Sequence, residues 1–421
     1  MGNKVVPGVV DIFGIINDRI YVGISEGLAQ TIVDRMTENG LNRNHFGVGF
    51  AYRIKYYKRI QLKLLKEISE TLEIRLKTIQ RNITLITSHR TTHVGLRNPI
   101  LPFDFRNKKG AIFVSSIFGD GGISKKGNVR YHNQDKRLIN IFINSISFMG
   151  DVDYKLYKRP DKTIHVSLPI VFGHILKTIG ISWGYKTTSD PKIPDFILNS
   201  NAILKSYFIR QFFNDEGNVR LKDRRLQVKQ TRELKTPVSK ETLIENPDKH
   251  LPSCLRDIKK MLLDLNITSK INLGALRSEN KKADWELSVY GKENLERFRR
   301  KIGFDSQKKL KGLDKCIETY KFPSSGRNER FLFALQHIAK IQSERGFVNK
   351  HILKRQSKRA LKTSTYFLVD LKKNGMIKEL ERIRDKKGRL LPVRYVITKK
   401  GLSHLRERKD RIFIRSVRES I

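Results

Sequence analysis

Acidic residues are scarce in this 421-residue sequence, where 42 Asp and Glu stand against 85 Lys and Arg, a formal net charge of +43. Cysteine is scarcer still: Cys254 and Cys316 lie far apart and in no CxxC or Cys/His cluster, which excludes a disulfide framework and a zinc ribbon. No apolar run approaches the roughly 20 residues of a membrane-spanning helix, and no signal peptide opens the chain. We therefore expect an intracellular, cytoplasmic protein of prokaryotic type with no membrane partner.

The excess of positive charge indicates a polyanion as partner. With 38% hydrophobic and 9% aromatic residues, the chain can form hydrophobic cores. Its length suits two to four domains of roughly 100–200 residues each. A pI near 10.3 on a folded chain is typical of a nucleic-acid binder, because each Lys or Arg placed against a phosphate releases condensed counterions. DNA and RNA are the candidate partners, ahead of an anionic membrane.

Two proline-containing segments predict domain boundaries. Pro99 and Pro102 precede a polar run, and a second break falls at Pro323-Ser324-Ser325-Gly326. The predicted domains are an N-terminal region (1–98), a central domain (99–322) and a C-terminal domain (327–421).

The N-terminal region shows helical periodicity from Gln61 onwards, with apolar residues at spacings of three and four. Ser69 and Thr71 interrupt this pattern, and the segment that follows is basic. Residues 61–90 are therefore compatible with a helix-turn-helix or with an amphipathic packing hairpin. The sequence predicts a helical region here.

The C-terminal domain carries 27 Lys and Arg against nine acids in 95 residues. Its pattern predicts helices over 331–341, over 348–353 and from Ser357, and then strands over 376–384 and 391–398. Three helices followed by a β-hairpin are typical of a winged helix, and the charge favours DNA binding over a protein-interaction role. The expected DNA contacts are Lys358, Arg359 and Lys362 on the third helix and Lys386, Lys387 and Arg389 at the hairpin tip.

The sharpest feature is a pair of related motifs at residues 113–121 and 209–217. Each is an apolar helical turn that ends in an acid followed by glycine, Asp120-Gly121 and Glu216-Gly217. A left-handed glycine would end the helix and leave the carboxylate at its C-terminus. The helix dipole disfavours a negative charge there by a few tenths to about 1 kcal/mol.

A divalent cation reverses that penalty, so two such helix ends brought together would form a site for Mg²⁺ or Mn²⁺, hard ions that prefer oxygen ligands. A single acid–glycine pair is usually an ordinary helix cap. Two copies in related surroundings favour the metal site.

Further similarity indicates an internal duplication. Residues 164–168 resemble residues 285–289, and each segment leads to an Ile-Gly-apolar stop. These segments lie 121 residues apart and the acidic motifs 96 apart, so the second repeat is 25 residues longer. The polar stretch 233–253, which contains three prolines, is the expected insertion and is predicted to be a surface loop or small lobe.

Together the motifs resemble the LAGLIDADG homing endonucleases in their single-chain, two-repeat form. The residue patterns of segments 133–139, 192–197 and 205–209 also resemble those of that family. The resemblance implies an α+β fold of two pseudo-symmetric αββαββα repeats, at about 110–190 and about 200–320. Saddle-shaped antiparallel sheets would lie along the DNA major groove.

The resemblance also implies roles for individual residues. Asp120 and Glu216 would bind the metals, and basic or polar residues around them would assist catalysis. Lys229, Gln227 and Lys292 are candidates, with a phosphate-contacting or solvated surface role as the alternative. Gln211 and Asp215 depart from the family pattern, because small residues are usual there, so the helices pack less tightly or these side chains find polar partners. The expected DNA contacts in the central domain are Lys125, Lys126, Arg130, Lys222, Arg224, Arg225 and Gln227.

The sequence therefore predicts a monomeric, metal-dependent, site-specific endonuclease that cleaves double-stranded DNA. The alternatives are a DNA-binding transcriptional regulator on the same scaffold and an intron maturase that binds structured RNA. An intein is not expected, because Met1-Gly2 and Glu419-Ser420-Ile421 lack the residues that splicing requires.

Overall fold

The computed structural model describes residues 6–15, 19–89, 94–320, 327–357, 360–385 and 387–406. The chain forms two compact units, Met1–Lys321 and Phe322–Ile421. Within the described ranges, no helix is both long and apolar enough to cross a membrane.

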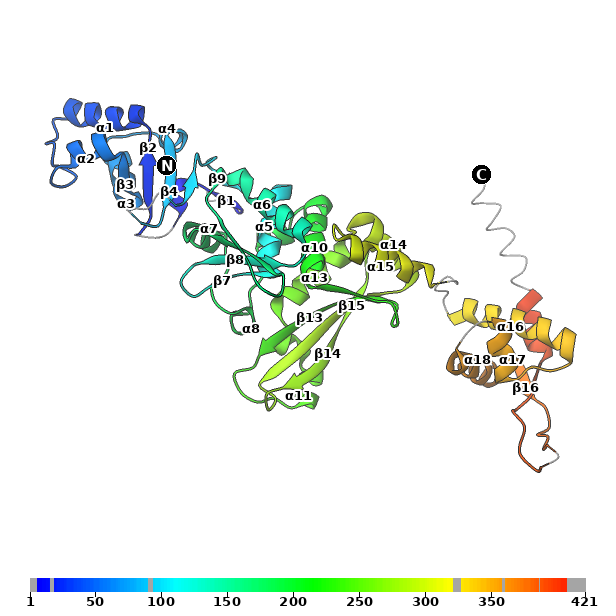
Figure 1. Ribbon diagram of the computed structural model, residues 1–421. Coiled ribbons are helices and arrows are strands. Elements are labelled where there is room, and N and C mark those ends of the chain that lie inside the picture. Colours follow the sequence, from blue (N-terminus) through cyan, green and yellow to red (C-terminus); the bar gives the residue numbers. More distant parts are fainter. Residues whose placement is uncertain are drawn as a thin grey trace, which may run out of the picture. The chain divides into compact units, whose positions relative to one another are not determined.

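The N-terminal part of the first unit is a mixed structure built on an antiparallel sheet of strand order β3-β2-β4-β5-β9 (Figure 1). Its strands are β2 (Tyr21–Ile24), β3 (Arg59–Gln61), β4 (Ile83–Thr87), β5 (Leu96–Arg97) and β9 (Asp151–Val152). Its helices are α1 (Glu26–Glu38), α2 (Phe50–Tyr57), α3 (Leu62–Thr71) and α4 (Leu76–Arg81). The expectation of a helical region was incomplete, because strands of two to five residues are too short to show an alternating pattern.

Residues 61–90 contain α3, a four-residue connection, the six-residue α4 and then β4. Leu65, Ile68 and Ile79 are fully buried, which is the packing of an amphipathic hairpin against a core. The helix-turn-helix role of this segment stays a prediction.

The central part contains two copies of one arrangement, each a four-stranded antiparallel sheet covered by helices. One sheet has the order β10-β11-β8-β7 and the other β14-β15-β13-β12. The strands are β7 (Gly121–Ile123), β8 (Val129–Asn133), β10 (Lys155–Lys158), β11 (Ile164–Leu168), β12 (Gly217–Arg220), β13 (Arg225–Glu233), β14 (Ser269–Arg277) and β15 (Lys282–Tyr290). The helices are α5 (Lys108–Phe118), α6 (Lys136–Ile146), α7 (Val171–Thr178), α8 (Lys186–Ser189), α9 (Asp195–Leu198), α10 (Ala202–Glu216), α13 (Ser253–Asp264), α14 (Lys292–Lys301) and α15 (Gln307–Glu318). Short elements β1 (Val9–Val10), η1 (Ile12–Gly14), β6 (Phe103–Asp104) and η2 (Ser147–Met149) complete the unit.

The order along the chain is α5-β7-β8-α6-β10-β11-α7 and then α10-β12-β13-α13-β14-β15-α14, which confirms the α+β fold with two αββαββα repeats. The strand registers agree as well. Gly121 pairs with Tyr131 as Gly217 pairs with Val228, and His132 pairs with His165 as Lys229 pairs with Glu286. His132 and Lys229 are therefore equivalent positions of the two repeats.

The expected insertion contains two short helices, α11 (Lys240–Glu245) and α12 (Pro247–His250), between β13 and α13. Most of its residues are exposed, and Leu243 is buried against the core. The longer second repeat therefore differs from the first by a surface lobe, as its proline content predicted.

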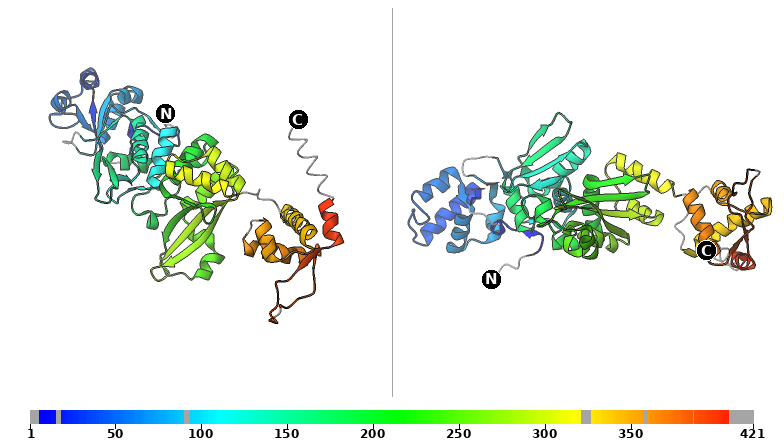
Figure 2. Two further views of the ribbon diagram at one scale, coloured as in Figure 1. Left: turned by 45° about the vertical axis from the view of Figure 1, so that its right-hand side comes forward. Right: turned by 90° about the horizontal axis from the view of Figure 1, so that it is seen from below.

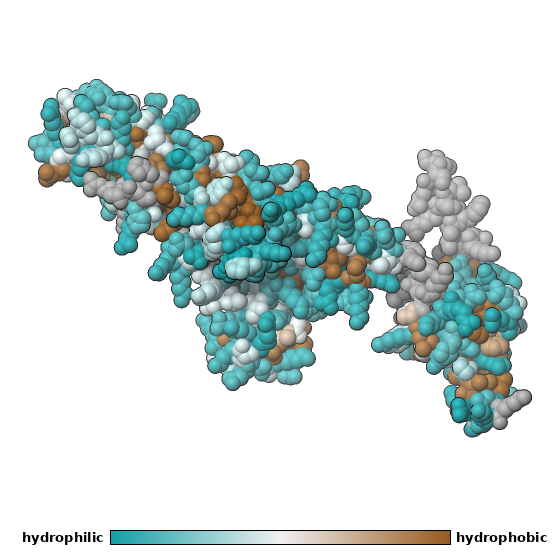
Figure 3. All heavy atoms as spheres, in the orientation of Figure 1, coloured by the Kyte–Doolittle hydropathy of each residue, from teal (hydrophilic) through white to brown (hydrophobic). Residues whose placement is uncertain are grey.

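Helices cover one face of each sheet and leave the other face open. Figure 1 shows α5, α6, α10, α14 and α15 gathered on one side of the two sheets, and Figure 2 shows the same layers from two further directions. On β8, Val129 and Tyr131 are buried, whereas Arg130 and His132 are exposed. Most of the surface visible in Figure 3 is hydrophilic, as the composition requires.

The second unit has helices α16 (Arg327–Arg345), α17 (Lys350–Ser357) and α18 (Leu361–Lys373), followed by the antiparallel pair β16 (Ile377–Glu379) and β17 (Tyr395–Ile397). Leu335, Ile338 and Leu371 lie in its core. Val348 does not start a helix, as the pattern suggested, but bridges to Tyr395. The strands are shorter than predicted because the hairpin beyond them holds only an isolated bridge between Arg384 and Leu390.

Candidate functional site

Helices α5 and α10 pack side by side, and their closeness explains the small residues of the first motif. Ser115 Oγ donates a hydrogen bond to the Phe208 carbonyl across the helix pair, at 2.6 Å. A Cβ on Gly119 would overlap the Asp215 carboxylate. Because α5 and α10 come this close, the acid that follows α5 and the acid that ends α10 lie at the same place.

The glycines that follow the acids have a different reason from the one the sequence suggested. Neither Gly121 nor Gly217 has a positive φ, so the expected left-handed helix end is wrong. A Cβ on Gly121 would strike the Ser116 carbonyl, and one on Gly217 would strike the Phe213 carbonyl. The glycines allow each chain to pass from helix into strand directly against the last helical turn.

The two unusual residues of the second motif find polar partners. Tyr131 Oη donates to Asp215 Oδ1 at 2.8 Å, and Gln211 Nε2 donates to the two Asp215 oxygens at 3.1 and 3.2 Å. Burial, and then the nearby Asp120, raise the pKa of Asp215 well above its ordinary value. Of the two alternatives left open by the sequence, the polar-partner one is correct.

We expect Asp215→Asn to stabilise the protein at pH 7, since the raised pKa of Asp215 means that folding disfavours its charged form. The penalty is absent below the ordinary carboxyl pKa and grows as pH rises. Unfolding in urea should therefore show a gain of roughly 1–3 kcal/mol at pH 7 that disappears in acid. The exposed control Asp248→Asn should change neither value, and an equal gain at both pH values would contradict the charge argument.

Asp120 and Glu216 are half-buried carboxylates with few partners. Burial raises the pKa of both carboxylates, and the positive charges of nearby Lys186 and Lys309 partly offset this by lowering the pKa of each. Asn133 Nδ2 donates to Asp120 Oδ2 at 2.8 Å, and His132 also lowers the pKa of Asp120. Within the described residues, neither carboxylate forms an ion pair, and no side chain donates a hydrogen bond to Glu216.

Two lysines hold the ends of the motif helices. Lys186 Nζ donates to the carbonyls of Phe118, at 2.9 Å, and Gly119. Lys309 Nζ donates to the carbonyls of Phe213, Asn214 and Asp215. Lys186 is the first residue of α8, which follows the first repeat, and Lys309 lies in the first turn of α15, which follows the second repeat. The two repeats therefore each place one lysine at the end of a motif helix. In these bonds neither lysine donates to a carboxylate oxygen of Asp120 or Glu216.

The donor set fits a hard divalent cation. Two carboxylates with raised pKa values stand together, two lysines engage carbonyls rather than those carboxylates, and Mg²⁺ typically takes one or two carboxylates plus waters and substrate phosphates. Among the described residues, no group of three or more His, Cys, Asp or Glu side chains forms a closed metal site. The arrangement therefore suits an open site that phosphate and water would complete.

A known protein family matches the segment that holds helix α10 and the sheet of the second repeat. Residues 204–303 fit the family model described as a LAGLIDADG-like domain. Residues 204–303 therefore form a LAGLIDADG-like domain. The matched segment holds Glu216 and the second repeat, and the first repeat has the same order of elements and registers.

Other comparisons support no finer conclusion. A "Probable translation initiation factor IF-2" of Methanocaldococcus jannaschii is 27% identical over 214 residues, which are 49% of this chain and 16% of that protein. The chain spans less than a quarter of the length of the curated relatives it matches. Full-length DUF199/WhiA from Thermatoga maritima is similar over 65% of this chain and 93% of its own, at 13% identity and a TM-score of 0.32. I-DmoI in complex with DNA and Mn is similar over 47% and 97%, at 16% identity and a TM-score of 0.30.

In the first repeat, the predicted DNA contacts share one concave surface. Lys125, Lys126 and Arg130 line a pocket of about 780 Å³ that also reaches Gly121 and Lys186. All three predicted residues are exposed. The pocket therefore extends from the open face of the first sheet to Gly121, which follows Asp120 in the chain, and to Lys186.

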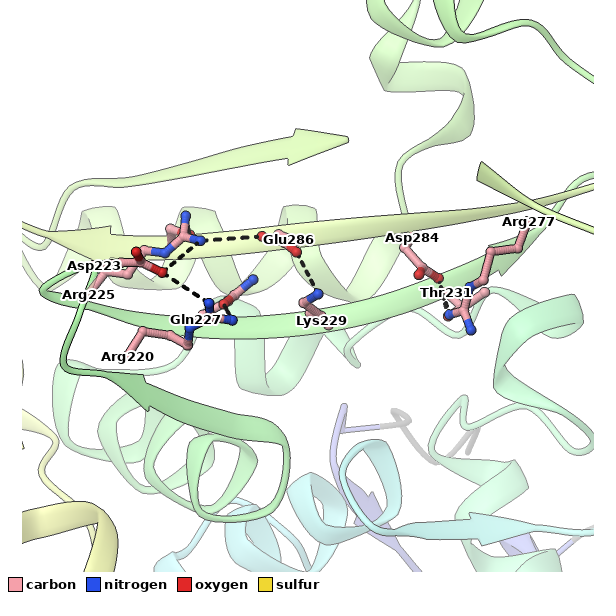
Figure 4. A network of polar contacts seen from close by, with 10 residues as sticks. Arg220, Asp223, Arg225, Gln227, Lys229, Thr231, Arg277, Asp284 and Glu286 are labelled. Atoms are coloured by element: carbon pink, nitrogen blue, oxygen red, sulfur yellow. Dashed lines mark hydrogen bonds and ion pairs between the residues drawn. The ribbon is translucent and has the colours of Figure 1, made fainter. Parts of the chain in front are cut away.

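In the second repeat, ion pairs tie together the cations on the open face (Figure 4). Lys229 Nζ lies 2.7 Å from Glu286 Oε1, and Arg225 contacts both Glu286 and Asp223. Arg277 lies 2.5 Å from Asp284, which also accepts a 2.7 Å bond from Thr231. The equivalents of the Lys229–Glu286 pair in the first repeat are two histidines, so the faces of the two repeats carry different chemistry.

Several sequence-predicted residues lie elsewhere than expected. Gln227 is only 2% exposed beneath Arg220 and its neighbours, so it does not present its amide to DNA, and that assignment is corrected. Lys292 begins α14 and faces Glu296, at 3.8 Å, and Lys229 is held by Glu286. Neither is among the main charges that act on Asp120 or Glu216. Lys222 and Arg224 are exposed in the turn between β12 and β13.

In the C-terminal unit, the described part of the chain contains three of the six expected DNA contacts. Lys362 on α18 and Lys387 and Arg389 in the hairpin are exposed. Lys358, Arg359 and Lys386 lie outside the described residues.

Sequence reasoning missed the residues that surround the acids. Lys186 and Lys309 lie 123 residues apart, two more than the 121-residue offset of the internal duplication, so a search for lysines within a few residues of that offset would have found them. Asn133 and His132 follow the first motif closely, but only the β7–β8 pairing brings Asn133 to Asp120.

Proposed function

We propose that this protein is a site-specific endonuclease that cleaves double-stranded DNA with Mg²⁺ or Mn²⁺. The observation that carries the proposal is the meeting of Asp120 and Glu216, one from each repeat, where α5 and α10 end beside two lysines. A DNA-binding scaffold gains nothing from open carboxylates beside phosphate, because they repel it. Both repeats belong to one chain, so a monomer would suffice to cut both strands.

The residues around the motif helix ends would have different roles in cleavage. Asp120 and Glu216 would hold the metal, which when bound supplies an activated water and neutralises charge on the leaving oxygen. Lys186 and Lys309 add positive charge at the same place, where negative charge develops on the phosphate. Asn133 fixes the orientation of Asp120 through its hydrogen bond. Lys125, Lys126 and Arg130 would hold the DNA backbone against the first sheet.

The test is incubation of the protein with a plasmid that carries the uninterrupted insertion site of its own gene. We expect a double-strand break with Mg²⁺ or Mn²⁺ and none with EDTA. Binding of that DNA without any nicking would instead support the transcriptional regulator. Preferential binding of structured intron RNA without DNA cleavage would support the maturase.

For the C-terminal unit we propose a winged helix that adds DNA affinity through its hairpin. Lys387→Gln with Arg389→Gln is expected to weaken DNA binding and to lower the slope of log K against log salt by up to about 1.8, near 0.9 per lost phosphate contact. The control Lys340→Gln with Lys350→Gln removes equal charge elsewhere in the unit and should have a smaller effect. An unchanged slope in the hairpin variant would indicate a protein-interaction role.

A further inference from the structure

The N-terminal part of the chain presents an unpartnered aromatic surface on helix α2. Tyr52, Tyr56 and Tyr57 are 60, 62 and 63% exposed, whereas Phe50 and Ile54 face the core. The rings of Tyr52 and Tyr56, one helical turn apart, lie 4.4 Å from each other at an angle of 38°. The preceding loop adds Val48, which is 86% exposed. We call loop 39–49 and α2 the tyrosine surface.

This surface belongs to an acid-free stretch of the chain. Between Asn39 and Lys66 the sequence has seven Lys and Arg and no Asp or Glu. Arg43 and Lys55 are exposed on the tyrosine surface itself. Lys58, at the end of α2, pairs at 3.3 Å with Glu26 of the neighbouring helix α1. The charge is therefore complementary to a polyanion and repels a basic partner, including a second copy of this chain.

The tyrosines restrict the kind of polyanion further. A surface that only attracted charge would not need three large rings on one short helix. Tyrosine combines an apolar ring with a hydroxyl donor, so it packs on a deoxyribose and donates to the adjacent phosphate. Two adjacent tyrosine rings one turn apart, with Lys55 between them in sequence, offer both contacts to a single DNA backbone.

We propose that the tyrosine surface is a second DNA-contact surface, which binds the sugar-phosphate backbone of duplex DNA outside the segment covered by the two sheets. The inference rests on the proposed function only in that DNA is the partner. It requires no cleavage, so its outcome is separate from that of the nuclease proposal.

The inference is tested by binding of the full-length protein to a random-sequence 60-base-pair duplex over a range of salt concentrations. We expect Arg43→Gln with Lys55→Gln to lower the salt slope by up to about 1.8 and to weaken binding by roughly tenfold at moderate salt. Tyr52→Ala with Tyr56→Ala should weaken binding several-fold and leave the slope nearly unchanged, because it removes packing without charge. Tyr52→Phe with Tyr56→Phe, which keeps the rings, should lose less.

A matched control removes the same charge from the same part of the chain. Lys66→Gln with Lys77→Gln lies on α3 and α4, and both lysines are exposed. We expect a smaller loss of affinity than for the tyrosine surface. If the control loses affinity and the tyrosine-surface variants keep it, the DNA contact lies on the α3–α4 pair and the inference fails. It also fails if a properly folded tyrosine variant binds the duplex with unchanged affinity, which would leave a protein as the occupant of this surface.

Discussion

Replacement of Asp120 by Asn or of Glu216 by Gln is expected to abolish cleavage of target DNA while DNA binding persists. Each carboxylate is half-buried at the end of a motif helix, and each lacks an ion pair within the described residues. An amide of the same size removes a metal ligand and leaves the helix packing in place. Loss of metal-assisted catalysis is worth several kcal/mol, so we expect a decrease of roughly 100-fold or more in the rate.

Binding should persist or strengthen in these variants when EDTA is present, because each removes a negative charge beside phosphate. The matched controls are Asp248→Asn and Glu241→Gln on the inserted lobe, where both acids are exposed. They should cleave at the wild-type rate. Full cleavage by the Asp120→Asn, Glu216→Gln double variant would place the catalytic metals elsewhere and overturn the proposed function.

Lys186→Met and Lys309→Met are expected to slow cleavage of both strands, each by roughly 10–100-fold. The reason is electrostatic, since Lys186 and Lys309 each act on both Asp120 and Glu216 rather than on one acid alone. Quantification of nicked and linear plasmid in a time course measures both cuts. Accumulation of a nicked intermediate in one variant would show instead that each lysine serves one strand.

A structural role must be separated from a catalytic one, because both lysines also bond the last carbonyls of the motif helices. Lys→Gln at each position keeps a hydrogen-bond donor and loses the charge. If Gln restores the melting temperature but not the rate, the charge is what cleavage requires. Lys292→Met, at one of the three positions that the sequence offered as catalytic candidates, is the matched control and should cleave normally.

Much of the repeat architecture was predictable because it depends on short-range patterns. The apolar motif helices, the two acid–glycine pairs and the paired strands around residues 164–168 and 285–289 are visible in the sequence, and β11 and β15 occupy those strands. The five-stranded N-terminal sheet was not visible. Its strands are short, and β9 comes from residues 151–152, more than 50 positions after β5.

The candidate site residues also divide into those that belong to a short-range sequence pattern and those that only long-range contacts bring together. Asp120 and Glu216 could be proposed from the sequence because each belongs to a local motif. Lys186 and Lys309 belong to no local motif. In a chain with 85 Lys and Arg, a single lysine can be assigned a role only when its neighbours in space are known. For Gln227 the local pattern was misleading. Strand alternation places it on the open face, but its side chain is buried and accepts a hydrogen bond from Arg220.

The scarcity of acids predicts a polyanionic partner from composition alone, because net charge is a sum and needs no structure. Which of the 42 acids matter was decided by motif spacing for two of them and by tertiary packing for the others. Only the folded chain sets Glu286, Asp284 and Asp223 against the cations of the second sheet and buries Asp215 beneath Gly119. Those contacts join residues from different strands and different repeats, and their energies depend on burial and distance, which a one-dimensional pattern does not contain.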